Sequence, residues 1–204
     1  HIWDVASGEL LRDLTGQSSL IWSVAYSPDG KTIVTASEDY TAFIWDSDTG
    51  ELLREIRGHS GTILSVEYSP DGRTIVTGSA DETARIWDAA TDTRLPNLTG
   101  HTLGVNSARY SPDGKTIVTA GDDQTVRIWD TATGYQLQEL TGYEYHVNYL
   151  VYSPNGKRVI TDTITIYGLS REMFAAYSPD GKTIIGASYD GMARIWNADS
   201  GERM

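Results

Sequence analysis

The stretch that decides the fold is G58-H-S-G-T-I-L-S-V-E-Y-S-P-D-G-R-T-I-V-T-G-S-A-D-E-T-A-R-I-W-D88. In its first apolar segment, Val66 and Tyr68 alternate with Ser65 and Glu67. This period of two predicts a β-strand. The S-P-D-G that follows predicts a turn, because proline presets φ at the second turn position and glycine accepts a positive φ.

The same stretch predicts four short strands in a row. The first covers residues 63–68 and the second covers residues 73–79. A polar corner at residues 80–82 leads to a third strand at 83–87, and a weaker fourth strand follows near residues 94–99. Four strands joined by short turns form an antiparallel meander. Such a sheet cannot bury its faces alone, but copies repeated around an axis pack on one another.

The unit recurs along the whole chain, which has 204 residues. The tryptophan of its I-W-D or I-W-N motif stands at Trp3, Trp45, Trp87, Trp129 and Trp196, with three spacings of 42 residues and a last one of 67. Its S-P-D-G or S-P-N-G turn begins at Ser27, Ser69, Ser111, Ser153 and Ser178, with three spacings of 42 and a last one of 25. A fixed period of this length is typical of repeat architectures.

The combination G-H, S-P-D-G, S-x-D and I-W-D at 42-residue spacing resembles the WD40 repeat family of β-propellers. The resemblance covers nearly the whole chain, and five partial matches in register argue against chance. It implies an all-β propeller of four to five blades, or an open arc of one. It also implies a single domain over residues 1–204, with repeats centred on Trp45, Trp87, Trp129, Tyr167 and Trp196 and an N-terminal fourth strand at residues 8–14.

The resemblance further implies a buried polar relay in each blade. The family's residues map here onto His59, Ser79, Asp81 and Trp87, and only this unit holds the whole set. The chemistry is the mutual satisfaction of buried groups, because an indole N–H needs an acceptor while a hydroxyl and a neutral imidazole each donate and accept.

The other units depart from the relay pattern. Gln17 stands where the first unit would have histidine, Gly121 where the third would have serine, and Tyr143 where the fourth would have histidine. The fifth unit has no Gly-His before it. We therefore expect incomplete or differently connected relays in those blades.

Two regions leave alternatives open. Residues 163–167, T-I-T-I-Y, are best interpreted as a third strand, and they would be a fourth strand only if residues are missing before them. Residues 8–14 could close a small five-bladed ring by joining the last blade. Ile2 and Trp3 would then duplicate the closing third strand, which instead suits a fragment of a longer array.

Composition excludes several function classes. The chain has no cysteine, so it has neither disulfides nor thiolate chemistry. Its net charge of -12 disfavours nucleic acid and anionic membrane surfaces as partners. No apolar run reaches membrane-spanning length, and the sequence contains no charged-then-apolar leader. It begins at His1 rather than Met, so we expect that something upstream was removed or not included. We favour a cytoplasmic location, although the sequence does not determine the compartment.

No residue is expected to be catalytic. His59, Ser79 and Asp81 are the residue types of a hydrolase triad, but their spacing matches the structural relay that Trp87 completes. Carboxylate pairs such as Asp122-Asp123 lie in strand corners without the spacing of metal ligands. We therefore expect no enzyme activity, no metal and no cofactor.

Binding is the favoured function. By resemblance, the narrow top face binds proteins or peptides, and it would be formed here by Leu20, Trp22, Glu38, Thr62, Leu64, Asn106, Asp122, His146, Asn148, Met173 and Tyr189. Exposed apolar members such as Trp22 are suited to anchor a partner, unless Trp22 simply packs over the seam between two blades. The leading hypothesis is a protein–protein interaction scaffold. The alternatives are a structural module that completes its propeller by homo-oligomerisation, or a non-catalytic sensor domain of a larger enzyme.

Overall fold

Every regular element in the described part of the chain is a β-strand. The structure, a computed structural model, describes residues 1–17, 19–91, 93–143, 146–163, 175–178, 180–187, 193–197 and 204. These residues form strands β1 to β19, and they include no helix that is long and apolar enough to span a membrane. The predicted all-β class is confirmed.

Three four-stranded antiparallel sheets form complete blades, with strands paired in chain order. Blade 1 contains β3 (Ile21–Tyr26), β4 (Thr32–Ser37), β5 (Ala42–Asp46) and β6 (Leu52–Ile56). Blade 2 contains β7 (Ile63–Tyr68), β8 (Thr74–Ser79), β9 (Thr83–Asp88) and β10 (Arg94–Thr99). Blade 3 contains β11 (Val105–Tyr110), β12 (Thr116–Gly121), β13 (Val126–Asp130) and β14 (Gln136–Leu140).

Three smaller sheets complete the described chain. Blade 4 contains β15 (Val147–Tyr152) and β16 (Val159–Thr163), and blade 5 contains β17 (Ala175–Tyr177), β18 (Thr183–Ala187) and β19 (Ala193–Asn197). The N-terminal hairpin pairs β1 (Ile2–Trp3) with β2 (Leu10–Arg12). Thr163 ends β16, and the rest of the predicted strand at 163–167 lies outside the described residues.

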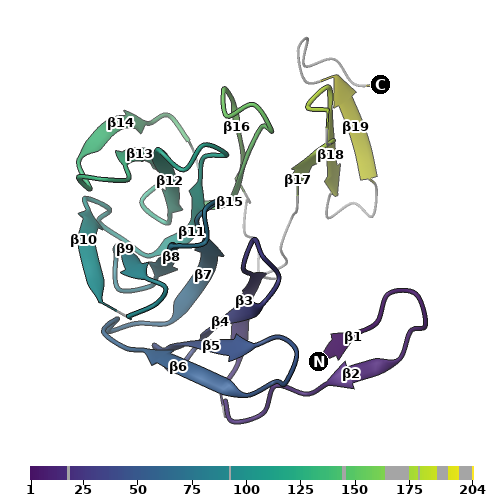
Figure 1. The fold of residues 1–204 in the computed structure, drawn as a ribbon. Coiled ribbons are helices and arrows are strands. Elements are labelled where there is room, and N and C mark those ends of the chain that lie inside the picture. The colour runs from purple at the N-terminus through teal and green to yellow at the C-terminus, as the bar shows by residue number, and fades with distance from the viewer. Residues whose placement is uncertain are drawn as a thin grey trace.

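The blades form an open arc. Figure 1 shows blades 1, 2 and 3 side by side, with their first strands toward the inside of the arc. The N-terminal hairpin lies at one end and blade 5 at the other. The possible ring closure by residues 8–14 is not what the structure has, because β2 pairs with β1. Within the described residues, β19 pairs only with β18.

The core lies in the seams between neighbouring blades. In the first seam, Val34 and Ile44 of blade 1 belong to one buried cluster with Ile63, Val66 and Tyr68 of blade 2. The next two seams repeat this arrangement. Each blade therefore covers the first strand of the blade after it, and burial of this apolar surface is the main stabilising contribution.

A contact between a tyrosine hydroxyl and a threonine hydroxyl lies at the S-P-D-G end of each of these seams. The Tyr68 hydroxyl lies 3.0 Å from Thr32 Oγ1, and the pairs Tyr110–Thr74 and Tyr152–Thr116 repeat this contact at 2.9 and 3.0 Å. The equivalent tyrosine of blade 1, Tyr26, is 54% exposed because no complete blade precedes it.

We expect Tyr68→Phe to lower the free energy of unfolding by about 1 kcal/mol, since Thr32 loses its partner in a largely buried seam. Tyr26→Phe removes the same group at the same register position, but from an exposed side chain. It should change stability by less than about 0.5 kcal/mol. Urea unfolding followed by tryptophan fluorescence compares the two variants, and equal losses would contradict a role for the seam hydroxyl.

Candidate binding face

A buried polar relay supports the top of blade 2. His59 Nδ1 lies 2.8 Å from Asp81 Oδ2, and His59 Nε2 lies 2.7 Å from Thr77 Oγ1. The Trp87 indole N–H donates to the same Thr77 oxygen at 2.9 Å. These contacts fit a neutral imidazole that donates from Nδ1 to Asp81 and accepts the Thr77 proton at Nε2. His59, Thr77 and Trp87 are all buried, so no substrate reaches the imidazole.

The relay hydroxyl belongs to Thr77, and the prediction of Ser79 in this role was wrong. Ser79 Oγ donates to Gly61 O at 3.0 Å and accepts from Asp81 N at 3.1 Å, so it shapes the corner after β8. Trp87 is paired with Ile75 in the sheet. Its indole reaches Thr77, two residues from Ile75 along β8, and Ser79 lies a further two residues, about 7 Å, away.

Blade 3 holds a second complete relay, which corrects the expectation that blade 2 has the only one. His101 Nε2 lies 2.7 Å from Thr119 Oγ1, and Trp129 donates to Thr119 at 2.8 Å. His101 Nδ1 lies 2.9 Å from Asp123 Oδ2. Gly121 therefore does not interrupt the relay. A Cβ there would come within 2.9 Å of both His101 Nδ1 and Gly104 O, so this corner suits glycine.

Blades 1 and 4 keep the threonine but change its partner. Thr35 donates to Gln17 Oε1 at 2.6 Å and accepts from the Trp45 indole at 2.9 Å. Thr161 donates to the Tyr143 hydroxyl at 3.3 Å. The threonine that recurs at 42-residue spacing is thus the constant member. The 42-residue spacing of these threonines was the sequence signal that would have identified the residue supplying the relay hydroxyl.

The relay histidines are neutral and their aspartates are ionised at neutral pH. Burial lowers the pKa of His59 and His101 below the ordinary value, although Asp81 and Asp123 oppose that shift. Burial alone would raise the pKa of Asp81, but hydrogen bonds from His59, Thr83 and Ser60 outweigh it and hold that pKa far below normal. Arg85 Nη2, 3.2 Å from Asp81, partly balances the charge.

The top face is assembled by one repeated backbone bond. The amide of Glu38 donates to Leu20 O at 2.9 Å, and Asp122 donates to Gly104 O at 2.8 Å. In blade 2 the same bond joins Ala80 to Thr62 at 2.9 Å. Each bond ties the corner after the second strand to the loop that enters the first strand. The two predicted loops of blades 1, 2 and 3 therefore lie together on one side of the arc.

The part of this face on blades 3 and 4 is polar and connected. Asn106 Nδ2 donates to Asp122 Oδ1 at 2.7 Å and to Asn148 Oδ1 at 3.2 Å. His146 Nδ1 donates to Asp122 O at 2.6 Å. All four residues were singled out individually from the sequence, and the structure brings them together. The bonds between them depend on the distance across the seam, which the sequence does not give.

The part on blades 1 and 2 is more apolar. Leu20, Trp22 and Glu38 are exposed, while Thr62 and Leu64 are half-buried. Met173 and Tyr189, the remaining predicted members, lie outside the described residues. The described face thus runs from exposed apolar side chains on blade 1 to a hydrogen-bonded polar cluster on blades 3 and 4.

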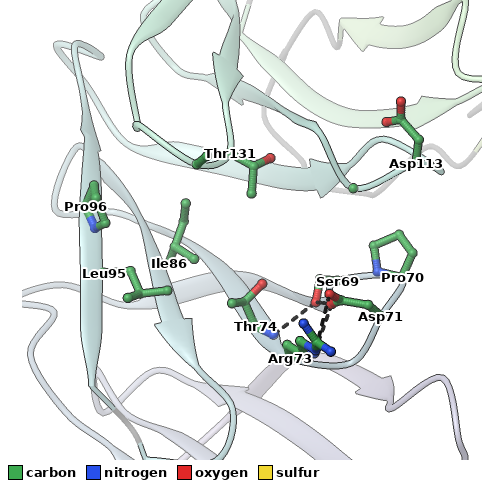
Figure 2. Close-up of a pocket in the computed structure, with 12 residues that line it drawn as sticks. Ser69, Pro70, Asp71, Arg73, Thr74, Ile86, Leu95, Pro96, Asp113 and Thr131 are labelled. Atoms are coloured by element: carbon green, nitrogen blue, oxygen red, sulfur yellow. Dashed lines mark hydrogen bonds and ion pairs between the residues drawn. The ribbon is translucent and has the colours of Figure 1, made fainter.

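The opposite side of the arc carries clefts of a different kind. Figure 2 shows one of about 520 Å³ between blades 2 and 3, lined by the turn residues Ser69, Pro70 and Asp71 with Leu95 and Thr131. A cleft lined by the equivalent turn residues lies between blades 1 and 2. We attribute both to the regular spacing of the blades. Within the described residues, no group of three or more His, Asp or Glu side chains could hold a metal ion.

We expect Thr77→Val to destabilise the chain by about 1–3 kcal/mol, because it leaves His59 Nε2 and the Trp87 indole without their shared partner. Thr119→Val should have a similar effect in blade 3. Thr99→Val, an exposed control on β10, should be nearly neutral. Chemical denaturation measures all three, and a neutral Thr77→Val would show that the relay adds no stability.

The lowered histidine pKa values predict weaker folding in mild acid. A folded state with a lowered histidine pKa binds fewer protons than the unfolded chain, so stability falls as pH drops below about 6.5. His59→Gln with His101→Gln should flatten this decline between about pH 7 and pH 5, because glutamine accepts from the relay threonine in blade 1 without titrating. Unfolding free energies measured across that range test it, and an unchanged slope would contradict the assignment.

Comparisons with known proteins agree with this geometry. The family model for the WD domain, G-beta repeat, matches residues 8–46, 50–88, 92–130 and 165–197. An uncharacterized WD repeat-containing protein of Schizosaccharomyces pombe is 51% identical over 37 residues, which are 18% of this chain and 9% of that relative. The match thus spans less than two thirds of the relative's length. Because the family model covers most of the chain, this protein belongs to the WD40 repeat family.

Proposed function

We propose that this chain is a non-enzymatic scaffold that binds a peptide or protein segment on its top face. WD40 domains generally bind proteins or peptides. The observation that supports this function most directly is the top face itself, where apolar Trp22 and Leu64 continue into the polar cluster around Asp122. The relay histidines His59 and His101 are buried and do not form part of this face.

The two parts of the face would serve different purposes. Trp22 and Leu64 occupy equivalent positions on β3 and β7, so an apolar side chain of the partner can contact both. Asp122 and Asn148 lie at partly exposed positions and offer acceptors to backbone or side-chain donors of the same partner. Large apolar residues of this kind commonly supply most of the binding energy, while surrounding polar groups fix the orientation.

Peptides selected from a displayed random library against the immobilised chain provide a defined probe. We expect Trp22→Asp and Leu64→Asp each to weaken binding of the selected peptides by at least about tenfold, the effect of losing one apolar anchor. Fluorescence anisotropy with labelled peptides measures the loss.

Tyr135→Asp is the matched control, because Tyr135 is 75% exposed in the turn before β14, away from the top face. It should leave peptide affinity unchanged, and circular dichroism should show that all three variants are folded. Unchanged affinity in the Trp22 and Leu64 variants, or an equal loss in Tyr135→Asp, would overturn the assignment of the binding face.

A further inference from the structure

The two clefts opposite the top face are built from matching positions of the repeat. Every residue that lines the cleft between blades 2 and 3, except Leu95, stands 42 positions after a residue that lines the cleft between blades 1 and 2. The regular spacing of the blades therefore explains why both clefts exist. It does not explain how they differ, because Pro96 stands in the second cleft where Arg54 stands in the first.

In the first cleft, the chain itself supplies a guanidinium group. Arg54 Nη1 donates across the seam to Ala89 O at 2.8 Å. Arg12, 42 positions before Arg54, makes a similar bond to Asp48 O at 3.0 Å. Charges in this cleft are balanced, since its lining includes three carboxylates and three cationic side chains: Asp29, Asp71 and Asp88 with Lys31, Arg54 and Arg73.

The second cleft lacks this guanidinium. Pro96 has no side-chain donor, so Thr131 O, the counterpart of Ala89 O, does not receive the bond that Arg54 makes. In addition, Thr131 Oγ1 is buried without a hydrogen-bond partner. Among the described residues that line this cleft, the carboxylates of Asp71 and Asp113 are accompanied by a single cation, Arg73.

The buried tyrosines beside the two clefts respond to this difference in charge. Burial raises the pKa of Tyr68 in the first seam, and Arg54 opposes that shift. Burial also raises the pKa of Tyr110 in the second seam, but there the carboxylates of Glu67 and Asp71 raise it further. The second cleft is therefore the more negative of the two, and it favours a cation from outside the chain.

The distribution of apolar and acidic groups in the second cleft suits an arginine side chain. Figure 2 shows Ile86, Leu95 and Pro96 toward one end of this cleft of about 520 Å³, with Asp113 toward the other. An arginine can lay its methylene groups along apolar side chains while its charged head stays among polar groups. Its planar fork of donors can bond a carbonyl and a carboxylate together, which the compact ammonium of lysine does less well.

We propose that the cleft between blades 2 and 3 binds an arginine side chain of a partner protein. The guanidinium donates to Thr131 O as Arg54 donates to Ala89 O in the first cleft. Its methylene groups contact Ile86 and Pro96, and Asp113 supplies the attraction of opposite charge. This site lies opposite the top face, so the proposal does not depend on peptide binding there.

Titration of the ¹⁵N-labelled chain with N-acetyl-L-arginine N-methylamide, followed by NMR of the backbone amides, tests the proposal. Saturable shifts should appear at Gly114, Thr131 and Ala132, with a Kd of a few millimolar, on the order expected for a single side chain. The citrulline analogue keeps the shape but has no charge, and it should bind at least about tenfold more weakly. The lysine analogue should also bind more weakly.

Variants separate this cleft from the rest of the surface. Pro96→Arg should weaken binding at least about tenfold, because its own side chain takes the place of the ligand. Pro96→Ala, which adds no donor, should bind like the unchanged chain. Circular dichroism should show that both variants are folded.

Charge is tested by a matched pair of turn substitutions. Asp113→Asn should weaken binding several-fold while keeping the turn, because Asn155 makes the same two turn bonds in blade 4 that Asp113 makes in blade 3. Asp29→Asn removes the equivalent charge from the first cleft and should leave binding unchanged.

The absence of saturable shifts at these amides up to about 20 mM ligand would overturn the proposal. Equal binding of the citrulline analogue, or unchanged binding in Pro96→Arg, would do the same. Tighter binding of free L-arginine than of the blocked derivative would indicate the amino acid itself, rather than a partner protein, as the ligand. Leu64→Asp should abolish peptide capture at the top face and leave arginine binding intact, so the two proposals can fail separately.

Discussion

The structure depends on one constraint, which is that no blade can bury its own faces. Each first strand is apolar on the side that meets the preceding blade, and it becomes buried only when the second and third strands of that blade cover it. Val66 and Ala108 are buried for this reason, while Val24 in the same register is not. Stability is therefore shared between neighbours, as expected for a repeat protein.

The strands and turns could be predicted because their determinants are local. The period of two in Ile63–Tyr68 and the repeated S-P-D-G turn fix a meander, whatever the rest of the chain does. Gly30 and Gly72 both have φ of +72°, as the turn requires. Ring closure could not be predicted in this way. It depends on whether β2 pairs with β1 or with β19, and the sequence permits both pairings.

The relays depend on side-chain contacts that local sequence patterns do not determine. The histidines and tryptophans were identifiable from their motifs. Whether Thr77 or Ser79 supplies the relay hydroxyl depended on how far along β8 the Trp87 indole extends. Gln17 and Tyr143 could be identified as the residues in the histidine position, but their contacts with Thr35 and Thr161 depended on the space between the side chains. The loops of blades 1, 2 and 3 that form the top face could be located from the repeat spacing. The bond from Asn106 to Asn148 could not, because it crosses a seam.

The top face follows from the same arrangement of blades. The top face consists of loop ends whose backbone is already hydrogen-bonded, so a partner that bound there would add contacts without changing the fold. On the proposed function, such a face is suited to varied partners.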